Sequence, residues 1–396
     1  MPLVSDTMTS EIPDKAILDA LANTGFPLEH RVTEAFRKEK WSVVSGRYYV
    51  DEQDGGAREL DLLAYRIRSI GTIDVVSTAL VNCKKEGENT WAFMSRAAPT
   101  VDANHDWCPV HWWTDEEPLA SYLRTGREKW KSDFERLAHK KQPEFYKPTR
   151  DIFAYQVVSP PGKPQPTKKA DAKPNPVRAA AAQNNVPIFS AVSGLLKALH
   201  FEMTSLPRRV PKRKRVYVFH LAVIADAPMV DVQHEGKVPK VKRIEKILHL
   251  ARFIVARESM AALVWFSTAN DLPGLVAKFG ELSEFDVATI KALVPKSYAA
   301  ITDNNDVRTS IAKVLQPLVI RAVNKALREA ESTKRASTLS LYFSRSKVLI
   351  LELDLDPDDV GLFNDPASEA SLTVAKALKE QAHYPGPFKF DSEIPF

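Results

Sequence analysis

A proline- and lysine-rich segment at residues 159–185 constrains the fold of this chain more than any other feature. It holds six prolines, five Lys or Arg residues, one Asp and no aromatic side chain. Such a segment cannot bury enough apolar area to offset the entropy of ordering its backbone. We predict a flexible linker or a long surface loop here, and the alternative is a basic arm that orders on a polyanion.

The part before this segment reads as a helix followed by strands. Apolar residues recur at helical spacing after Pro27, and runs rich in Val, Ile, Leu and Tyr follow. We predict a helix at 28–40, strands at 41–50, 58–68, 78–85 and 90–94, and a further helix at 116–138.

The part after this segment mixes helices and strands in the same way. The pattern predicts a helix at 188–203, strands at 216–224 and 262–267, a helix at 272–282, a helix at 306–331 bent at Pro317, and a hairpin at 338–355. A last helix begins at Asp365 and Pro366, and residues 242–257 fit either a helix or a strand.

This order of elements indicates the α/β class, with a mixed central sheet flanked by helices. We divide the chain into the first half of a core, a mostly helical insertion, the linker, the second half of the core, and C-terminal helices with a β-hairpin. The corresponding ranges are 1–100, 101–158, 159–185, 186–284 and 285–396.

The cysteine content and the charge limit the setting and the partners. Cys83 and Cys108 are the two cysteines of 396 residues, so a disulfide framework is excluded and a reducing, cytoplasmic compartment is expected. No apolar run approaches the roughly 18 residues of a membrane span, so we expect no membrane partner. The net charge of +5 is small, so a nucleic-acid surface would have to come from local clustering.

Several polar residues can converge at one end of the first three strands. Glu29 lies on the first predicted helix and Asp61 on the second strand, while alternation puts Asn82, Lys84 and Glu86 on one face of the third. Carboxylates hold Mg²⁺ through oxygen, and a lysine beside the ion orients or deprotonates a water, which suits phosphodiester hydrolysis. The alternative is a set of solvated charges on a half-exposed sheet.

The surrounding residues resemble a known superfamily. The matching stretches are 24–29 (TGFPLE), Trp41, 58–64 (RELDLLA), 81–85 (VNCKK) and 91–93 (WAF). They are similar to restriction-endonuclease-like domains of the PD-(D/E)xK superfamily, which have a helix, a three-strand meander, a helix and further strands. The resemblance implies DNA cleavage with Mg²⁺, in which Glu29 and Asp61 bind the metal and Lys84 is the lysine of the acid-x-Lys pair.

The sequence departs from the superfamily pattern at one position. The superfamily has Glu or Asp two residues before the lysine, and this chain has Asn82. An amide oxygen binds Mg²⁺ without bringing charge. Three outcomes stay open: weak catalysis with Mg²⁺ or Mn²⁺, replacement of the missing charge by Glu86, or an inactive site on a fold kept for binding.

Two clusters of cations are candidates for contact with nucleic acid. The first has six cations, Arg208, Arg209, Lys212, Arg213, Lys214 and Arg215, and the second has five, Lys237, Lys240, Lys242, Arg243 and Lys246. Both flank the strand predicted at 216–224, where they could neutralise backbone phosphates, although most such runs are solvated faces.

The sequence thus supports two hypotheses. The first is a metal-dependent endonuclease that binds nucleic acid, with DNA preferred over RNA as the substrate. The second is an inactive nuclease-fold scaffold, a subunit of a larger nucleic-acid-processing complex. It binds nucleic acid through its basic segments, and it binds a protein partner or a second copy of itself through the C-terminal region. His105, Cys108 and His111 are a weaker zinc candidate, since zinc would need a fourth ligand.

Overall fold

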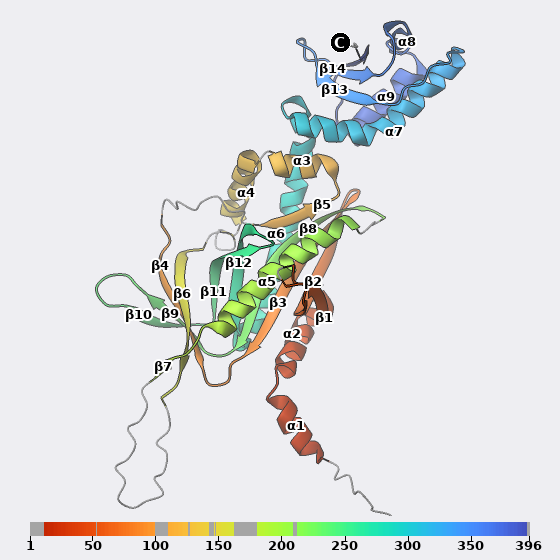
Figure 1. Cartoon of the computed structure of the whole chain (residues 1–396). Coiled ribbons are helices and arrows are strands. Elements are labelled where there is room, and N and C mark those ends of the chain that lie inside the picture. Colours follow the sequence, from red (N-terminus) through yellow and green to blue (C-terminus); the bar gives the residue numbers. More distant parts are fainter. Residues whose placement is uncertain are drawn as a thin grey trace, which may run out of the picture.

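A seven-stranded mixed sheet forms the centre of the computed structural model (Figure 1). The structure describes residues 12–52, 54–99, 110–125, 127–141, 146, 148–161, 180–208 and 212–393. Helices flank the sheet, so the predicted α/β class is confirmed. Most of the predicted linker, residues 162–179, lies outside the described residues. Within the described ranges, no helix has both the length and the hydropathy to cross a bilayer.

The central sheet runs in the order β1, β2, β3, β8, β12 and β11, with β5 beside the first half of β8. The strands β1 to β3 form an antiparallel meander, whereas β8 is parallel to both β3 and β12. The bounds are β1 Ser42–Val50, β2 Ala57–Ile70, β3 Ile73–Lys85, β5 His111–Thr114, β8 Lys214–Asp226, β11 Lys246–Val255 and β12 Glu258–Thr268. β3 and β8 are buried along most of their length because helices cover both faces of the sheet.

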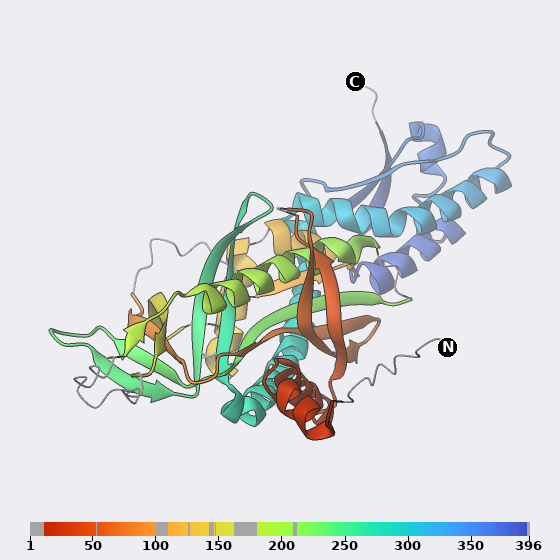
Figure 2. The ribbon, with the colours of Figure 1, turned by 60° about the horizontal axis from the view of Figure 1, so that its bottom comes forward.

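Helices cover the two faces of this sheet (Figure 2). On one face lie α2, Phe26–Lys38, and the long α6, Leu272–Ala299, while α5, Val186–Ser205, crosses the other. The spacing that predicted α2 buries Leu28, Val32 and Phe36 in the core shared with α6. A short helix, α1 at Asp14–Ala22, precedes α2.

A second, five-stranded sheet packs beside the first, in the order β10, β9, β4, β6 and β7. Its bounds are β4 Thr90–Ala97, β6 Arg150–Ser159, β7 Ala181–Ala182, β9 Met229–Gln233 and β10 Lys240–Ile244. The ambiguous residues 242–257 therefore belong to strands β10 and β11.

The predicted mostly helical insertion at 101–158 needs a correction. It contains α3, Glu117–Thr125, and α4, Arg127–Lys141, but it also contributes β5 to the central sheet and β6 to the second sheet. The aromatic residues Trp112 and Trp113 lie in β5, where large rings pack well against neighbouring strands.

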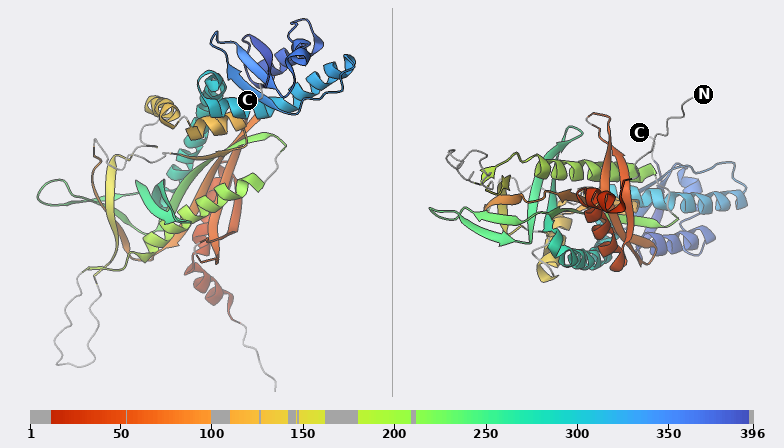
Figure 3. Two further views of the ribbon diagram at one scale, coloured as in Figure 1. Left: turned by 45° about the horizontal axis from the view of Figure 1, so that its top comes forward. Right: turned by 90° about the horizontal axis from the view of Figure 1, so that it is seen from below.

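The C-terminal region forms a three-stranded sheet against helices. The predicted long helix and hairpin are confirmed as α7, Asn305–Glu329, and the pair β13, Leu339–Phe343, and β14, Leu349–Leu353. α8 at Pro357–Gly361, α9 at Glu369–Gln381 and an unpredicted strand β15 at Phe388–Ser392 follow, and β15 pairs in parallel with β14. Figure 3 shows this region and the β9–β10 hairpin at opposite ends of the molecule.

Candidate active site

The strands β2 and β3 separate at the point where the predicted site residues lie. Their pairing ends at Leu62 and Val81. Beyond that pair β2 stays with β1, and β3 stays with β8 as far as Lys85. The next residues on the two diverging strands are Asp61 and Asn82. We call this place the fork.

Asp61 spans the fork with its side chain. The backbone amide of Cys83 donates a hydrogen bond of 2.6 Å to Asp61 Oδ2. The carboxylate therefore accepts from a β3 amide just beyond the last backbone pair between β2 and β3. Burial and the charge of Glu59 raise the pKa of Asp61, while the Cys83 amide and the Lys84 ammonium lower it. Asp61 is thus a half-buried carboxylate whose negative charge is not fully balanced by its neighbours.

Glu29 belongs to the same electrostatic cluster. It lies in the first turn of α2. Burial raises its pKa most, the charges of Asp61 and Glu59 raise it further, and Lys84 lowers it. Because Asp61 and Lys84 both shift the pKa of Glu29, the fold brings these three groups within electrostatic reach of one another. Such a cluster favours a cation.

Asn82 presents an acceptor that no group of the described residues satisfies. The residue is only 9% exposed, and its Oδ1 is buried without a hydrogen-bond partner among the described residues. An unpaired buried carbonyl oxygen costs roughly 1–3 kcal/mol. A bound cation or water would remove that cost.

Glu86 is placed differently from the sequence expectation. β3 ends at Lys85, and Glu86 opens the following turn, where its carbonyl accepts from the Asn89 amide at 3.3 Å. Strand alternation therefore does not fix its orientation, and it is absent from the charges that shift the pKa of Glu29 or Asp61. Glu59 is instead the further acid whose charge raises the pKa of both Glu29 and Asp61. Its spacing of two residues from Asp61 was the signal for it in the sequence.

The acidic side chains of the fork do not by themselves form a complete set of metal ligands among the described residues. Among the residues that the structure describes, no three His, Cys, Asp or Glu side chains come close enough together to hold a metal ion. A metal ion held by Glu29 and Asp61 would therefore need a further ligand of another kind, such as a side-chain amide.

The first cation cluster lies at the other end of the sheet. Arg213 Nε donates to Asp74 Oδ1 at 2.9 Å, and Lys214 Nζ donates to the Asp115 carbonyl at 2.8 Å. Asp74 and Lys84 lie near opposite ends of β3, which separates the cluster from the fork by roughly 30 Å at roughly 3.3 Å per residue. Arg208 and Lys212 are exposed there, Arg215 donates to the Tyr217 hydroxyl at 3.1 Å, and Arg209 lies outside the described residues.

The second cation cluster lies toward the fork end. Lys237, Lys240, Lys242 and Arg243 are exposed, and none of them forms an ion pair with a described residue. Lys246 Nζ forms an ion pair with Asp271 Oδ2 at 3.1 Å. The strand β10 is an edge strand whose first four residues are exposed on both faces, so it projects its cations into solvent.

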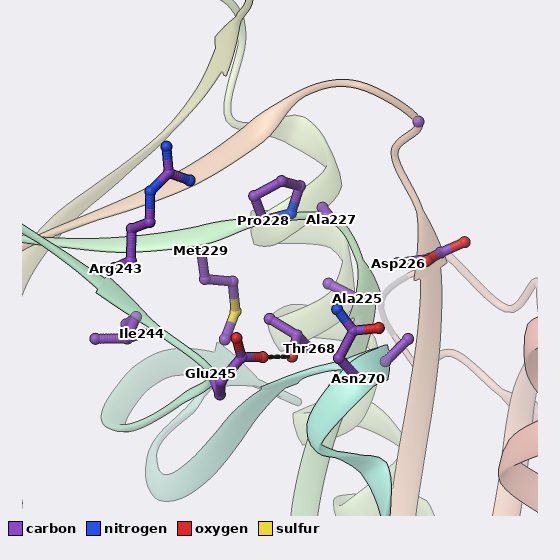
Figure 4. Close-up of a pocket in the computed structure, with 12 residues that line it drawn as sticks. Ala225, Asp226, Ala227, Pro228, Met229, Arg243, Ile244, Glu245, Thr268 and Asn270 are labelled. Atoms are coloured by element: carbon purple, nitrogen blue, oxygen red, sulfur yellow. Dashed lines mark hydrogen bonds between the residues drawn. The ribbon is translucent and has the colours of Figure 1, made fainter.

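A cavity of about 250 Å³ opens at the carboxyl ends of β8 and β12 (Figure 4). Asp226, Glu245 and Arg243 line it, together with Gly87 of the turn after β3. Thr268 Oγ1 donates to Glu245, as Figure 4 shows. Because Asp226 is the register partner of Lys85, this cavity borders the end of β3 that carries Lys84.

Comparisons with known proteins identify no relative. No family model, curated protein or solved structure matches this chain.

For the zinc candidate, His105 and Cys108 lie outside the described residues, and His111 Nε2 lies 3.0 Å from the carbonyl oxygen of Ala261. Burial lowers the pKa of His111.

Proposed function

We propose that this protein binds nucleic acid on a restriction-endonuclease-like core and hydrolyses phosphodiester bonds with one Mg²⁺ or Mn²⁺ at the fork. The observation that carries the proposal is the convergence of Glu29, Asp61 and Lys84, from a helix and two strands, beside the unsatisfied Asn82 Oδ1.

The topology supports the proposed core. In chain order, α2 precedes the antiparallel meander β1 to β3, and α5 then precedes β8, which lies parallel to β3. With β4 to β7, α3 and α4 inserted between β3 and α5, this is the order of helix, three strands, helix and strand that the sequence resemblance implies. The polar cluster lies where the pairing of β2 and β3 ends.

The residues of the fork fit a hard divalent cation. Glu29 and Asp61 offer carboxylate oxygens, and Asn82 offers a neutral amide oxygen that has no partner in the part of the chain that the structure describes. A bound ion would polarise a phosphate oxygen and acidify a water. With one acid fewer than the superfamily pattern, the affinity for the ion is low, and Mn²⁺ binds more tightly than Mg²⁺ at such a site.

Lys84 would act next to these ligands. Its ammonium lowers the pKa of both Glu29 and Asp61, so it helps to keep them ionised at neutral pH. The same charge can position a water or a phosphate oxygen near the scissile bond.

The nucleic acid would approach along β10. Its cations, which have no ion-pair partner among the described residues, lie on the side of the molecule that also holds the Figure 4 cavity, which Arg243 lines. We favour DNA over RNA because the resemblance is to DNA-cleaving domains. Phosphate neutralisation by the exposed lysines would give a strongly salt-dependent affinity.

Cleavage of supercoiled and single-stranded DNA with Mg²⁺ or Mn²⁺ tests the proposal. Asp61→Asn keeps an acceptor for the Cys83 amide but removes the charge, and Glu29→Gln does the same on α2. Glu34→Gln is the matched control, because Glu34 lies on the same helix, is exposed and pairs with Arg37 at 3.0 Å. Loss of activity in the first two variants, with wild-type activity in the control, is expected. Equal activity in all four proteins would assign the cleavage to a contaminant.

A second candidate function is a non-catalytic scaffold on the same fold. Asn82 favours it, and so does the lack of a three-acid group among the described residues. The C-terminal helices and hairpin would then bind a protein partner or a second copy. Salt-dependent DNA binding without cleavage under any metal, in wild type and in Asn82→Glu, would favour the scaffold.

A further inference from the structure

A second cavity, of about 280 Å³, lies on the α5 face of the central sheet. Its floor consists of two rows of side chains across β2, β3 and β8. The strand register places Tyr65, Thr78 and Phe219 in one row and Ile67, Val76 and Tyr217 in the next. Apart from the Thr78 hydroxyl and the two phenols, this floor is apolar.

The walls come from β1 and from the end of α5. Val44 and Arg47 of β1 line the cavity opposite Glu202 of α5 and Leu206, the residue that follows this helix. Val44 is 38% exposed and Ile67 is 42% exposed, so the cavity opens to solvent past these apolar side chains. A small ligand can enter there without a change in the backbone.

Two polar groups in the cavity lack hydrogen-bond partners among the described residues. Thr78 is 3% exposed, and its Oγ1 forms no hydrogen bond with a described residue. Arg215 donates through NH1 to the Tyr217 hydroxyl at 3.1 Å, but its Nε is buried and unpaired among the described residues. Native structures rarely leave such groups unsatisfied.

The other charges of the cavity already have partners. Arg47 holds Glu202 through both carboxylate oxygens, with NH2 3.1 Å from Oε2. Near Arg215, Asp74 accepts from Arg213 at 2.9 Å and from Ser69 at 2.7 Å, and Asp115 Oδ1 accepts from the Arg215 amide at 2.6 Å. The guanidinium of Arg215 therefore retains unused donors beside an apolar surface.

We infer that this cavity binds a small monocarboxylate with an apolar body. The carboxylate accepts from Arg215 Nε and the Thr78 hydroxyl, while the body covers the Val76 and Phe219 surface. The volume has room for roughly nine groups of the size of a water molecule, which suits a short aliphatic or aromatic acid. The single guanidinium of Arg215, whose Nε has no partner among the described residues, matches a single negative charge. The inference does not depend on the proposed nuclease activity.

Calorimetry with hexanoate and 1-hexanol tests the inference, since the two probes share the apolar chain and differ in the charge. Charge-assisted hydrogen bonds contribute roughly 1.5–3 kcal/mol, so hexanoate is expected to bind roughly tenfold to a hundredfold more tightly than hexanol. Equal affinities, or no saturable binding of hexanoate, would overturn the inference.

Variants locate the binding site. Arg215→Met keeps the apolar stem and removes the donors, so it should abolish the preference for hexanoate over hexanol. Arg213→Met is the matched control, since Arg213 is exposed, pairs with Asp74 and does not line the cavity. Val76→Phe fills the floor and should block both probes while the far-ultraviolet circular dichroism stays unchanged. Unaltered hexanoate binding in folded Arg215→Met, or equal losses in Arg213→Met, would place the probe elsewhere and refute the inference.

Discussion

His220 Nε2 lies 2.9 Å from Asp286 Oδ2 in the interior between β8 and α6. The same oxygen accepts from Ser77 Oγ at 2.5 Å, so one carboxylate of α6 joins the two central strands β3 and β8. All three residues are less than 10% exposed. This polar contact fixes the position of α6 on an otherwise apolar face.

Asp286→Ala is expected to destabilise the fold strongly. The change leaves two buried polar groups without their acceptor, and breaking a buried pair typically costs about 3–5 kcal/mol. Urea unfolding would measure the free energy of unfolding. Glu284→Ala is the control, because Glu284 lies on the same helix, is 65% exposed, and should change stability by less than about 0.5 kcal/mol. Similar losses in both variants would contradict a special role for Asp286.

Glu29→Gln is expected to stabilise the metal-free protein at neutral and alkaline pH. The pKa of Glu29 is raised above its ordinary value of 4.5, so the folded state binds its proton more tightly than the unfolded state does. Wild-type stability from this group is therefore present at low pH and lost as the pH rises through the folded-state pKa. Urea unfolding at pH 4 and pH 8 checks this. The stability advantage of the variant should appear at pH 8 and shrink at pH 4, and an advantage present only at pH 4 would refute it.

Asn82→Glu should strengthen metal binding at the fork. A third carboxylate beside Glu29 and Asp61 raises Mg²⁺ affinity by roughly an order of magnitude and reduces the preference for Mn²⁺. Calorimetry with each ion and plasmid cleavage would measure both effects. Asn82→Leu, which adds no ligand, is the control. If Asn82→Glu binds no more metal than Asn82→Leu, the fork is not a metal site.

The salt dependence of DNA binding should identify the contact surface. Replacing Lys240, Lys242 and Arg243 with Ser is expected to lower the slope of log affinity against log salt by roughly 0.9 per lost phosphate contact. The matched control replaces Arg213, Lys214 and Arg215, three cations with internal partners at the opposite end of the sheet. A larger change in the control would move the nucleic acid to that end.

Limited proteolysis should cut first within 159–185, because the sequence there offers little apolar area for burial. The two fragments should stay together on a sizing column, since β3 from one fragment pairs along its whole length with β8 from the other. Separated fragments would show that the two halves fold as independent domains.

Local patterns predicted the elements that carry the candidate site. Helical spacing identified α2, and alternation put Asn82 and Lys84 on one face of a strand near Asp61. The distance between the Arg213 cluster and Lys84 could not be predicted, because it follows from the parallel register of β3 and β8, two strands far apart in the sequence. β6 and β15 were missed for the same reason, since each is stabilised by a distant partner strand.

The parallel pairing of β3 with β8 also matters while the chain is being made. The strand β3 leaves the ribosome long before its partner strand β8 has been translated. During that interval the apolar edge of β3 is unpaired and able to join the edge of another nascent chain. Only the antiparallel meander with β2 can form early, since its loop is short. The nascent chain is therefore prone to aggregate until β8 has been synthesised and pairs with β3. Chaperone binding should concentrate on nascent chains that end between β3 and β8.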